Sequence, residues 1–288
     1  MRNGRATIRA VLVEDNKELL SSIKKCLIDS GKGIVLSRFS FFCCKMDIME
    51  YRYQGIILSK YDIAEVDRFY VVFTREAGKI RAVGKGVRNP DAKLAGNLEP
   101  LTLSEISISR TKGRGKITGA IANNNFLAIK SNYHALSRVF YIFGIIEKMI
   151  TDEEKDERVF DLILNFLETL DDLVLKGGSE EKIDVLTLGF LFQLLHILGY
   201  GLNMERCIKC NKKLLPDNNY FSAAAGGVFC RECVSPNGRK VKINSGTIKL
   251  IRLFVRNKIQ SFTKLTVSKE DIGNSKVVAG EMVRWITG

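Results

Sequence analysis

The sequence predicts an α+β protein that combines a small β-domain, an all-helical domain and a four-cysteine ribbon inserted among the helices. Short segments with β-type patterns, separated by turn residues, run from about residue 55 to residue 121. Longer segments with apolar residues at helical spacing occupy 133–202 and return after 245. Two Cys-x-x-Cys pairs lie between these two helical stretches. We therefore expect a N-terminal extension (1–50), a β-domain (51–130) and a helical domain (131–288) with the ribbon at 205–235.

Charge is distributed unevenly along the chain, whose formal net charge is +13. Residues 51–130 have fourteen Lys and Arg against seven Asp and Glu, and residues 207–288 have fifteen against five. The segment between them, 131–206, has seven against fourteen. Two basic segments therefore flank an acidic one, which indicates a polyanionic partner: nucleic acid first, a membrane surface second. A basic surface that only solvates the protein is the alternative.

The first 50 residues do not continue into a recognisable domain. An apolar segment at 8–13 ends in Glu14 and Asp15, and 16–27 has helical spacing, which resembles the first strand and helix of a response-regulator receiver domain. The phospho-acceptor strand and the later lysine loop of such a domain do not follow. We expect either an appended fragment or a start codon placed too far upstream, with Met46 or Met49 as the functional start.

The β-domain is expected to contain five short strands that close into a small barrel or a sandwich, since closure removes exposed strand edges. The expected strands cover 55–60, 68–74, 79–86, 101–109 and 116–121. Three aromatic residues of the second strand, Phe69, Tyr70 and Phe73, are expected to be core residues, which is the more frequent role at β spacing. Stacking on bases is the alternative.

Cations cluster on the third strand and on two adjoining loops. With the period of two of a β-strand, Lys79, Arg81 and Lys85 share one face. We predict that these cations, the glycine-rich loop after them and the hairpin at 110–116 contact a sugar-phosphate backbone. A solvated turn is the alternative for the hairpin. The predicted DNA-binding residues are Lys79, Arg81, Lys85, Arg88, Arg110, Lys112 and Arg114.

Five helices are expected, at 133–150, 156–175, 184–202, 245–258 and 268–286. The acidic run 152–154 is expected to open the second helix, where negative charge suits the helix dipole. Ser245 is the expected cap of the fourth helix, and Trp285 is expected to anchor the fifth. Three cations of the fourth helix form a stripe that is a possible second basic site, for DNA phosphates or an acidic peptide, or a solvated face. They are Lys249, Arg252 and Arg256.

The two cysteine pairs have the spacing of a structural zinc site, with nineteen residues between them. The predicted ligands are Cys207, Cys210, Cys230 and Cys233. Four thiolates leave no open position for water, so the zinc is expected to be structural rather than catalytic. Two disulfides or a redox dithiol are the alternatives. No apolar run is long enough to cross a bilayer, so we expect a cytoplasmic protein that makes no membrane contact, in which Cys26, Cys43 and Cys44 are free thiols.

Several motifs occur in the order found in the bacterial recombination mediator family RecO. They are Gly55-Ile56-Ile57-Leu58, Asp67-Arg68, Phe73-Thr74-Arg75-Glu76-Ala77-Gly78-Lys79, Lys85-Gly86, Leu94-Ala95-Gly96 and the cysteine pairs. The sequence resembles this family over about 51–280. The resemblance implies that the β-domain is an OB-fold, followed by a helical domain and a zinc-binding element.

The resemblance also implies a non-enzymatic role in repair through the RecF pathway. Such a protein binds single- and double-stranded DNA, anneals complementary strands and helps RecA replace single-strand-binding protein (SSB). RecR and the SSB C-terminal tail are the implied partners, RecA is an indirect one, and the location is the cytoplasm, at the nucleoid. The alternatives from the residues alone are a zinc-ribbon RNA-binding protein of translation or transcription, a zinc-dependent hydrolase or nuclease, and a structural scaffold. The closed set of four cysteines disfavours the hydrolase.

Overall fold

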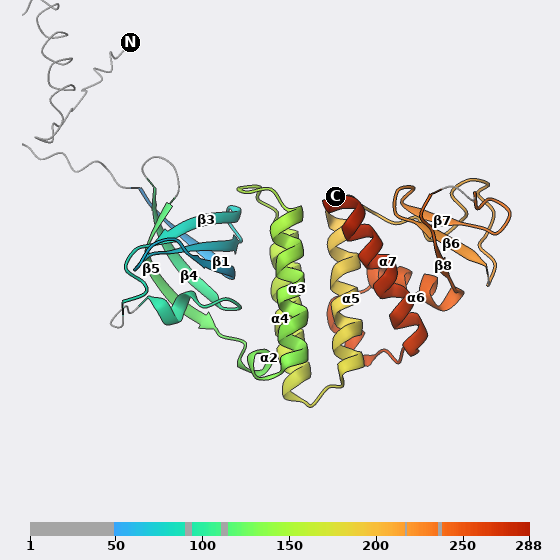
Figure 1. Ribbon diagram of the computed structural model, residues 1–288. Helices are drawn as coiled ribbons and strands as arrows, with labels where there is room; N and C mark the ends of the chain where they lie inside the picture. Colours follow the sequence, from blue (N-terminus) through green and yellow to red (C-terminus); the bar gives the residue numbers. More distant parts are fainter. Residues whose placement is uncertain (1–48, 90–93, 111–114, 217, 236–237) are drawn as a thin grey trace, which may run out of the picture. The chain divides into compact units, whose positions relative to one another are not determined.

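The computed structural model describes residues 49–89, 94–110, 115–216, 218–235 and 238–288 (Figure 1). The expectations for the first 48 residues therefore lie outside the described part of the chain. Residues 50–288 form one compact unit, in which a β-barrel is followed by helices and a small sheet. Among the described helices, none is both long and apolar enough to cross a membrane.

Five strands close into the N-terminal barrel, in the order β1-β2-β3-β5-β4. They are β1 (Met49–Asp62), β2 (Arg68–Thr74), β3 (Gly78–Gly84), β4 (Leu103–Arg110) and β5 (Gly115–Asn124). The pairing of β3 with β5 is parallel, whereas β2 pairs antiparallel with both β1 and β3. A 3-10 helix, η1 (Ala95–Leu98), precedes β4 and buries Leu98 in the barrel core. This five-stranded barrel confirms the OB-like β-domain.

Strand β2 is buried on both of its faces, which explains its almost continuous apolar sequence. Tyr70 and Val72 point into the barrel core. Phe69 and Phe73 belong instead to the larger core that the helices share. All three aromatic rings are at most 8% exposed, so they serve packing, as the spacing predicted, and are not available to stack on bases.

The helical part is organised around one buried helix, α5. Its helices are α2 (Leu127–Ser131), α3 (Tyr133–Met149), α4 (Glu157–Leu175), α5 (Glu180–Ile197), α6 (Ser245–Arg256), the 3-10 helix η2 (Ile259–Lys264) and α7 (Lys269–Thr287). Helix α5 contacts α3, α4, α6, α7 and η2 (Figure 1). At Gly189 of α5 an added Cβ would lie 2.3 Å from Phe262 of η2, so the small residue lets η2 approach closely.

The four-cysteine ribbon lies between α5 and α6 in the sequence. Its three strands, β6 (Asn219–Ser222), β7 (Gly227–Phe229) and β8 (Val241–Ile243), form an antiparallel sheet in the order β7-β6-β8. Phe221 and Val228 of this sheet are fully buried in the same core as the helices. The ribbon is therefore packed onto the helical part, and its sheet extends past the predicted end at residue 235.

Local capping groups shift several predicted helix boundaries. Ser179 caps α5, so this helix begins four residues earlier than predicted. It also ends earlier, before Gly199 with φ 85°. The cap of α6 is Asn244, whose side chain accepts from the N–H of Thr247, and not Ser245 as predicted. The short helix α2 was not predicted at all.

Candidate nucleic-acid interface and metal centre

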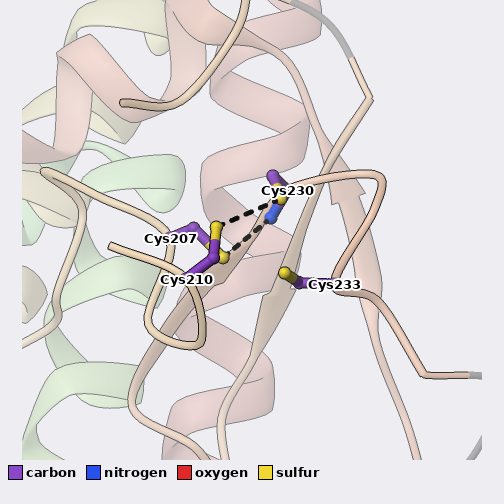
Figure 2. Close-up of side chains that lie close together, drawn as sticks. All are labelled: Cys207, Cys210, Cys230 and Cys233. Carbon is purple, nitrogen blue, oxygen red and sulfur yellow. Dashed lines mark hydrogen bonds between the residues drawn. The ribbon is translucent and has the colours of Figure 1, made fainter. Parts of the chain in front are cut away.

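The four predicted cysteine ligands converge on one point (Figure 2). Their sulfur atoms all lie within 4.8 Å of one another. The Sγ atoms of Cys210 and Cys230 are 3.8 Å apart, too far for a disulfide bond of about 2.05 Å. This separation matches the edge of a tetrahedron whose centre lies about 2.3 Å from each sulfur, the geometry of a four-thiolate site. The cluster is therefore compatible with a bound metal ion.

Burial and hydrogen bonds shift the pKa values of two of these thiols in opposite directions. Burial raises the pKa of Cys207, but backbone N–H groups directed at its sulfur lower the pKa to about 6. One of them, the N–H of Cys230, lies 3.4 Å from that sulfur. Desolvation and the neighbouring sulfurs raise the pKa of Cys233 to about 12. Metal binding requires all four sulfurs as thiolates, and a bound cation would stabilise that form.

The cations predicted on the third strand do not form one exposed track. Arg81 and Lys85 are exposed, but Lys79 is only 3% exposed. The ammonium of Lys79 donates to the carbonyl oxygen of Glu147 (2.7 Å) and lies 3.1 Å from Oδ1 of Asp152. The Nε of Arg81 lies 2.6 Å from Oδ2 of the same carboxylate. The predicted exposure is wrong for Lys79, because the loop between α3 and α4 covers it.

The segment 74–79 joins the barrel to the helices. Arg75 donates to Oδ1 of Asp161 on α4 (2.6 Å). Gly78 has φ 67°, and an added Cβ would lie 2.0 Å from the carbonyl oxygen of Glu154. Packing against the loop after α3 therefore explains why Gly78 has no room for a side chain and why Lys79 is buried.

The loop after β3 presents two of the predicted cations to solvent. Lys85 and Arg88 are both exposed. The N–H of Gly86 donates to Oδ1 of Asp67 (2.8 Å), which fixes the turn. Nη1 of Arg88 donates to the carbonyl oxygen of Ala64 (3.2 Å) and lies 3.6 Å from Oδ2 of Asp62. The other donors of the guanidinium are the ones left for a ligand.

The hairpin cations are only partly described. Arg110 at the end of β4 is half-buried, and its Nη2 lies 2.9 Å from Oε1 of Glu153. Lys112 and Arg114 lie outside the described residues. Arg110 and Arg81 therefore both face the acidic run 152–154.

The sequence analysis did not predict that the acidic residues 152–154 would form ion pairs with cations of the barrel. They were assigned to the start of the second helix, but α4 begins at Glu157 with Asp156 as its cap. Aspartate is a strong N-cap residue, and this signal would have placed 152–154 in the preceding loop. In the structure, Asp152 and Glu153 bind cations of the barrel.

The three cations predicted as a stripe on α6 differ in exposure and in the contacts that they make. Lys249 is exposed. Arg252 donates to the carbonyl oxygens of Met204 and Glu205 and holds the start of the ribbon against α6. Arg256 lies 2.7 Å from Oε1 of Glu205. Only Lys249 and Arg256 are therefore exposed enough to contact a second molecule directly.

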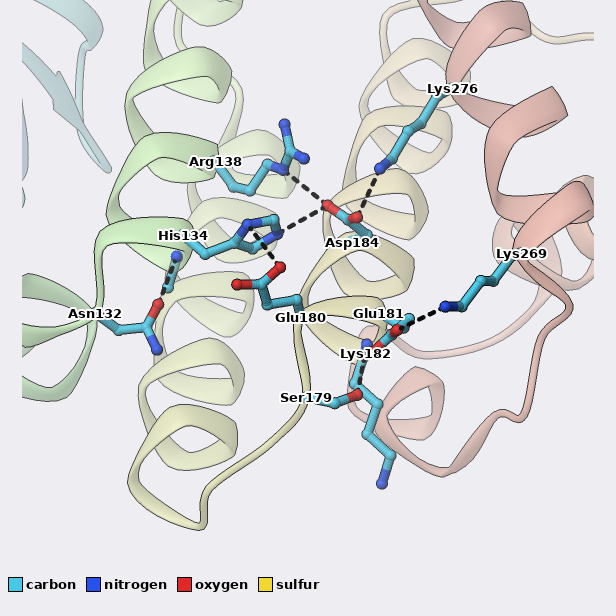
Figure 3. Close-up of polar contacts among 11 residues, drawn as sticks. Asn132, His134, Arg138, Ser179, Glu180, Glu181, Lys182, Asp184, Lys269 and Lys276 are labelled. Atoms are coloured by element: carbon cyan, nitrogen blue, oxygen red, sulfur yellow. Dashed lines mark hydrogen bonds and ion pairs between the residues drawn. The ribbon is translucent and has the colours of Figure 1, made fainter.

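A further polar cluster ties three helices together around Asp184 of α5 (Figure 3). Its carboxylate accepts from Arg138 of α3 (2.7 Å) and from Lys276 of α7 (2.6 Å), and His134 lies 3.2 Å away. Burial raises the pKa of Asp184, but Lys276 and Arg138 outweigh that effect and hold the pKa below its ordinary value. The cluster contributes to the packing of α3, α5 and α7.

Comparisons with known proteins agree with the fold. The family model described as "Recombination protein O N terminal" matches residues 46–126, and "Recombination protein O C terminal" matches residues 130–285. A DNA repair protein RecO of Dehalococcoides mccartyi is 28% identical over 238 residues, which cover 82% of this chain and 90% of that protein. The DNA repair protein RecO of Desulforamulus reducens is 24% identical over 219 residues, covering 76% and 82%. That of Halalkalibacterium halodurans is 24% identical over 230 residues, covering 80% and 87%.

Proposed function

Because the chain belongs to the RecO family, we propose that it is a recombination mediator that binds single- and double-stranded DNA, anneals complementary strands and assists RecA loading on SSB-coated DNA. The observation that carries this proposal is the match of both family models, which together span the barrel, the helices and the ribbon. Family membership itself gives a role in DNA repair and recombination.

The proposed DNA contacts are the exposed cations of the barrel. Arg81, Lys85 and Arg88 lie on β3 and the loop after it, and Lys112 and Arg114 of the hairpin are proposed to extend this surface. Lys79 is instead proposed to hold the barrel against the loop between α3 and α4. Each phosphate contact releases counterions, so log–log plots of affinity against salt should have a slope of about −0.7 per contact for single strands.

Annealing requires no bond chemistry. It requires that two polyanions be held close together while their mutual repulsion is screened. Exposed cations on the barrel and in the basic segment 207–288 would supply that screening. We therefore propose a non-enzymatic mechanism in which the protein binds strands and releases the annealed duplex.

The ion proposed for the cysteine cluster is Zn²⁺. Thiolate ligands select soft or borderline metals, and a tetrahedral four-cysteine set is typical of structural zinc. When bound, the ion would neutralise the thiolates and cross-link the two cysteine loops. The proposed role is to stabilise the ribbon.

The proposed partners are RecR, the SSB C-terminal tail and, indirectly, RecA. An acidic tail requires exposed cations, which Lys249 and Arg256 offer on α6. The proposed place of action is the cytoplasm, at the nucleoid. No membrane contact is proposed.

Equilibrium binding to a fluorescent single-stranded oligonucleotide over a range of salt concentrations tests the proposal. Wild type should bind at low salt and weaken steeply as salt rises. The double variant Arg81→Glu/Lys85→Glu should bind more weakly and with a shallower salt slope. The charge-matched control Lys148→Glu/Lys182→Glu, at exposed helical lysines, should resemble wild type. Absence of DNA binding by wild type would contradict the proposal, and tighter binding of structured RNA would favour the RNA-binding alternative.

A further inference from the structure

A hollow lies between the C-terminal turns of α7 and the sheet of the ribbon, and its lining residues include neither the barrel cations nor the four cysteines. Its lining combines two aromatic side chains with three cations. The residues that matter are Phe229, Arg239, Lys240, Glu281, Arg284 and Trp285. Its volume is about 610 Å³, within the roughly 300–1,000 Å³ of sites that hold small ligands.

Trp285, the only tryptophan of the chain, lines this hollow while 53% exposed. The expectation that it anchors α7 is therefore wrong, and Met282 on the preceding turn is the buried residue. A large flat ring left in water in the lining of a hollow is a surface on which a planar aromatic group can stack. A nucleobase is such a group, and stacking tolerates every base because each one has a π-face.

Two arginines are held in place beside this ring. Arg239 Nε lies 2.9 Å from Oε2 of Glu281, and Arg284 Nη2 lies 2.9 Å from Oε1 of the same carboxylate. The Glu281 side chain is 10% exposed, whereas the two arginine side chains are 70% and 58% exposed. The carboxylate thus orients both guanidinium groups and leaves most of their donors facing solvent.

The charge of the hollow favours an anion. Among the lining side chains, Arg239, Arg284 and Lys240 give three positive charges and Glu281 gives one negative charge. Guanidinium groups suit phosphate because their paired donors match its oxygens. An exposed aromatic ring next to fixed cations is the combination by which proteins hold unpaired bases and their backbone together.

We propose that this hollow is a second binding site for single-stranded nucleic acid, with a base stacked on Trp285 and a neighbouring phosphate bound by Arg239 and Arg284. The inference rests on the proposed function and deepens it. It gives the protein a strand contact on the ribbon side of the helical part, separate from the cations on β3. Duplex DNA is excluded from the stacking contact, because its bases are already stacked on one another.

The single tryptophan provides the test, since its fluorescence reports on this hollow alone. Titration of full-length wild type with a thymidine oligonucleotide at low salt should quench the fluorescence, whereas a duplex of the same length should not. Trp285→Leu should weaken single-strand binding roughly fivefold or more, and Trp285→Phe, which keeps a flat ring, should restore much of that loss. Duplex affinity should be the same in all three proteins.

Each outcome separates this site from the barrel cations. In Arg81→Glu/Lys85→Glu, residual single-strand binding should still quench Trp285. If wild type binds the oligonucleotide but its fluorescence does not change, or if Trp285→Leu binds as wild type does, the second site is disproved while the proposed function stands. If an acidic peptide quenches Trp285 and the oligonucleotide does not, the hollow is a peptide site and the inference is wrong. If wild type binds no DNA at low salt, the proposed function itself fails.

Discussion

The ammonium of Lys79 lies 3.1 Å from the carboxylate of Asp152, and both belong to the contact between the barrel and the helices. The N–H of Glu153 also donates to the carbonyl oxygen of Lys79 (2.7 Å), so backbone and side chain make the same connection. A lysine that the sequence places among phosphate-binding cations is thereby used to hold the loop after α3. The consequence is that neighbouring cations of β3 have different roles.

Substitution of Lys79 and Arg81 should separate those roles. Lys79→Met removes a buried charged donor, so we expect it to lower the free energy of unfolding by about 1.5–3 kcal/mol, with DNA affinity within twofold of wild type. Arg81→Met removes a half-exposed ion pair, worth about 1 kcal/mol or less, and should weaken DNA binding. Urea unfolding and oligonucleotide titration of both variants measure the two effects. If the Lys79→Met protein is as stable as wild type but does not bind DNA, Lys79 contacts DNA and the structural role assigned to it is wrong.

Two glycines with the same backbone conformation provide a test of the packing between the barrel and the α3–α4 loop. Gly78 and Gly86 have φ of 67° and 66°, so alanine at either should cost about 1–2 kcal/mol from the left-handed conformation. At Gly86 the nearest atom to an added Cβ is 3.5 Å away, whereas at Gly78 it is a backbone oxygen at 2.0 Å. Gly78→Ala should therefore be clearly less stable than Gly86→Ala in thermal unfolding. Equal melting temperatures would show that the barrel and the α3–α4 loop do not pack this closely.

The cysteine cluster should bind one zinc ion per chain, measured by elemental analysis of the purified protein. Removal of the ion by a strong chelator should lower the melting temperature, because metal binding to such a site contributes directly to folding. Cys210→Ser should lose the ion, whereas Cys26→Ser, which changes a cysteine that is not among the four predicted ligands, should keep it. Full metal content in Cys210→Ser would contradict the assignment of the ligands.

Asp184 should make the helical part sensitive to acid. Its pKa is lowered in the folded protein, so its stabilising contribution is complete above the unfolded value of about 3.9 and is lost as the pH falls through the lower folded value. Asp184→Asn should cost about 2 kcal/mol at pH 7, and the difference from wild type should shrink below about pH 4. Asp172→Asn, at an exposed ion pair with Lys176, should change stability by less than about 0.5 kcal/mol. A pH-independent difference between wild type and Asp184→Asn would contradict this role.

Patterns local in sequence were sufficient to predict much of the fold. The apolar spacing predicted the strands and the long helices, and the cysteine spacing predicted which four sulfurs converge. These features depend on neighbouring residues or on a known ligand geometry, so the sequence alone contains them. The cap of α6 was missed by one residue because Asn244 and Ser245 are both good caps.

Tertiary contacts account for what the sequence could not predict. Periodicity places Lys79 on the same face as Arg81, but it does not show that the loop after α3 covers that end of the strand. In the same way, the apolar character of Trp285 predicts burial, whereas its position in the last turns of α7 leaves it 53% exposed. Exposure at these positions depends on segments more than 60 residues away in the sequence, or on the way the helix ends.

Annealing of complementary strands coated with SSB tests most directly whether exposed cations of the barrel bind the DNA backbone. Wild type and Lys148→Glu/Lys182→Glu should anneal the strands at the same rate. Arg81→Glu/Lys85→Glu should be slower by tenfold or more at the same zinc content, with a melting temperature lowered only by loss of the ion pair between Arg81 and Asp152. If the Arg81→Glu/Lys85→Glu protein is folded and anneals the strands as fast as wild type, the barrel cations are not the DNA-binding surface.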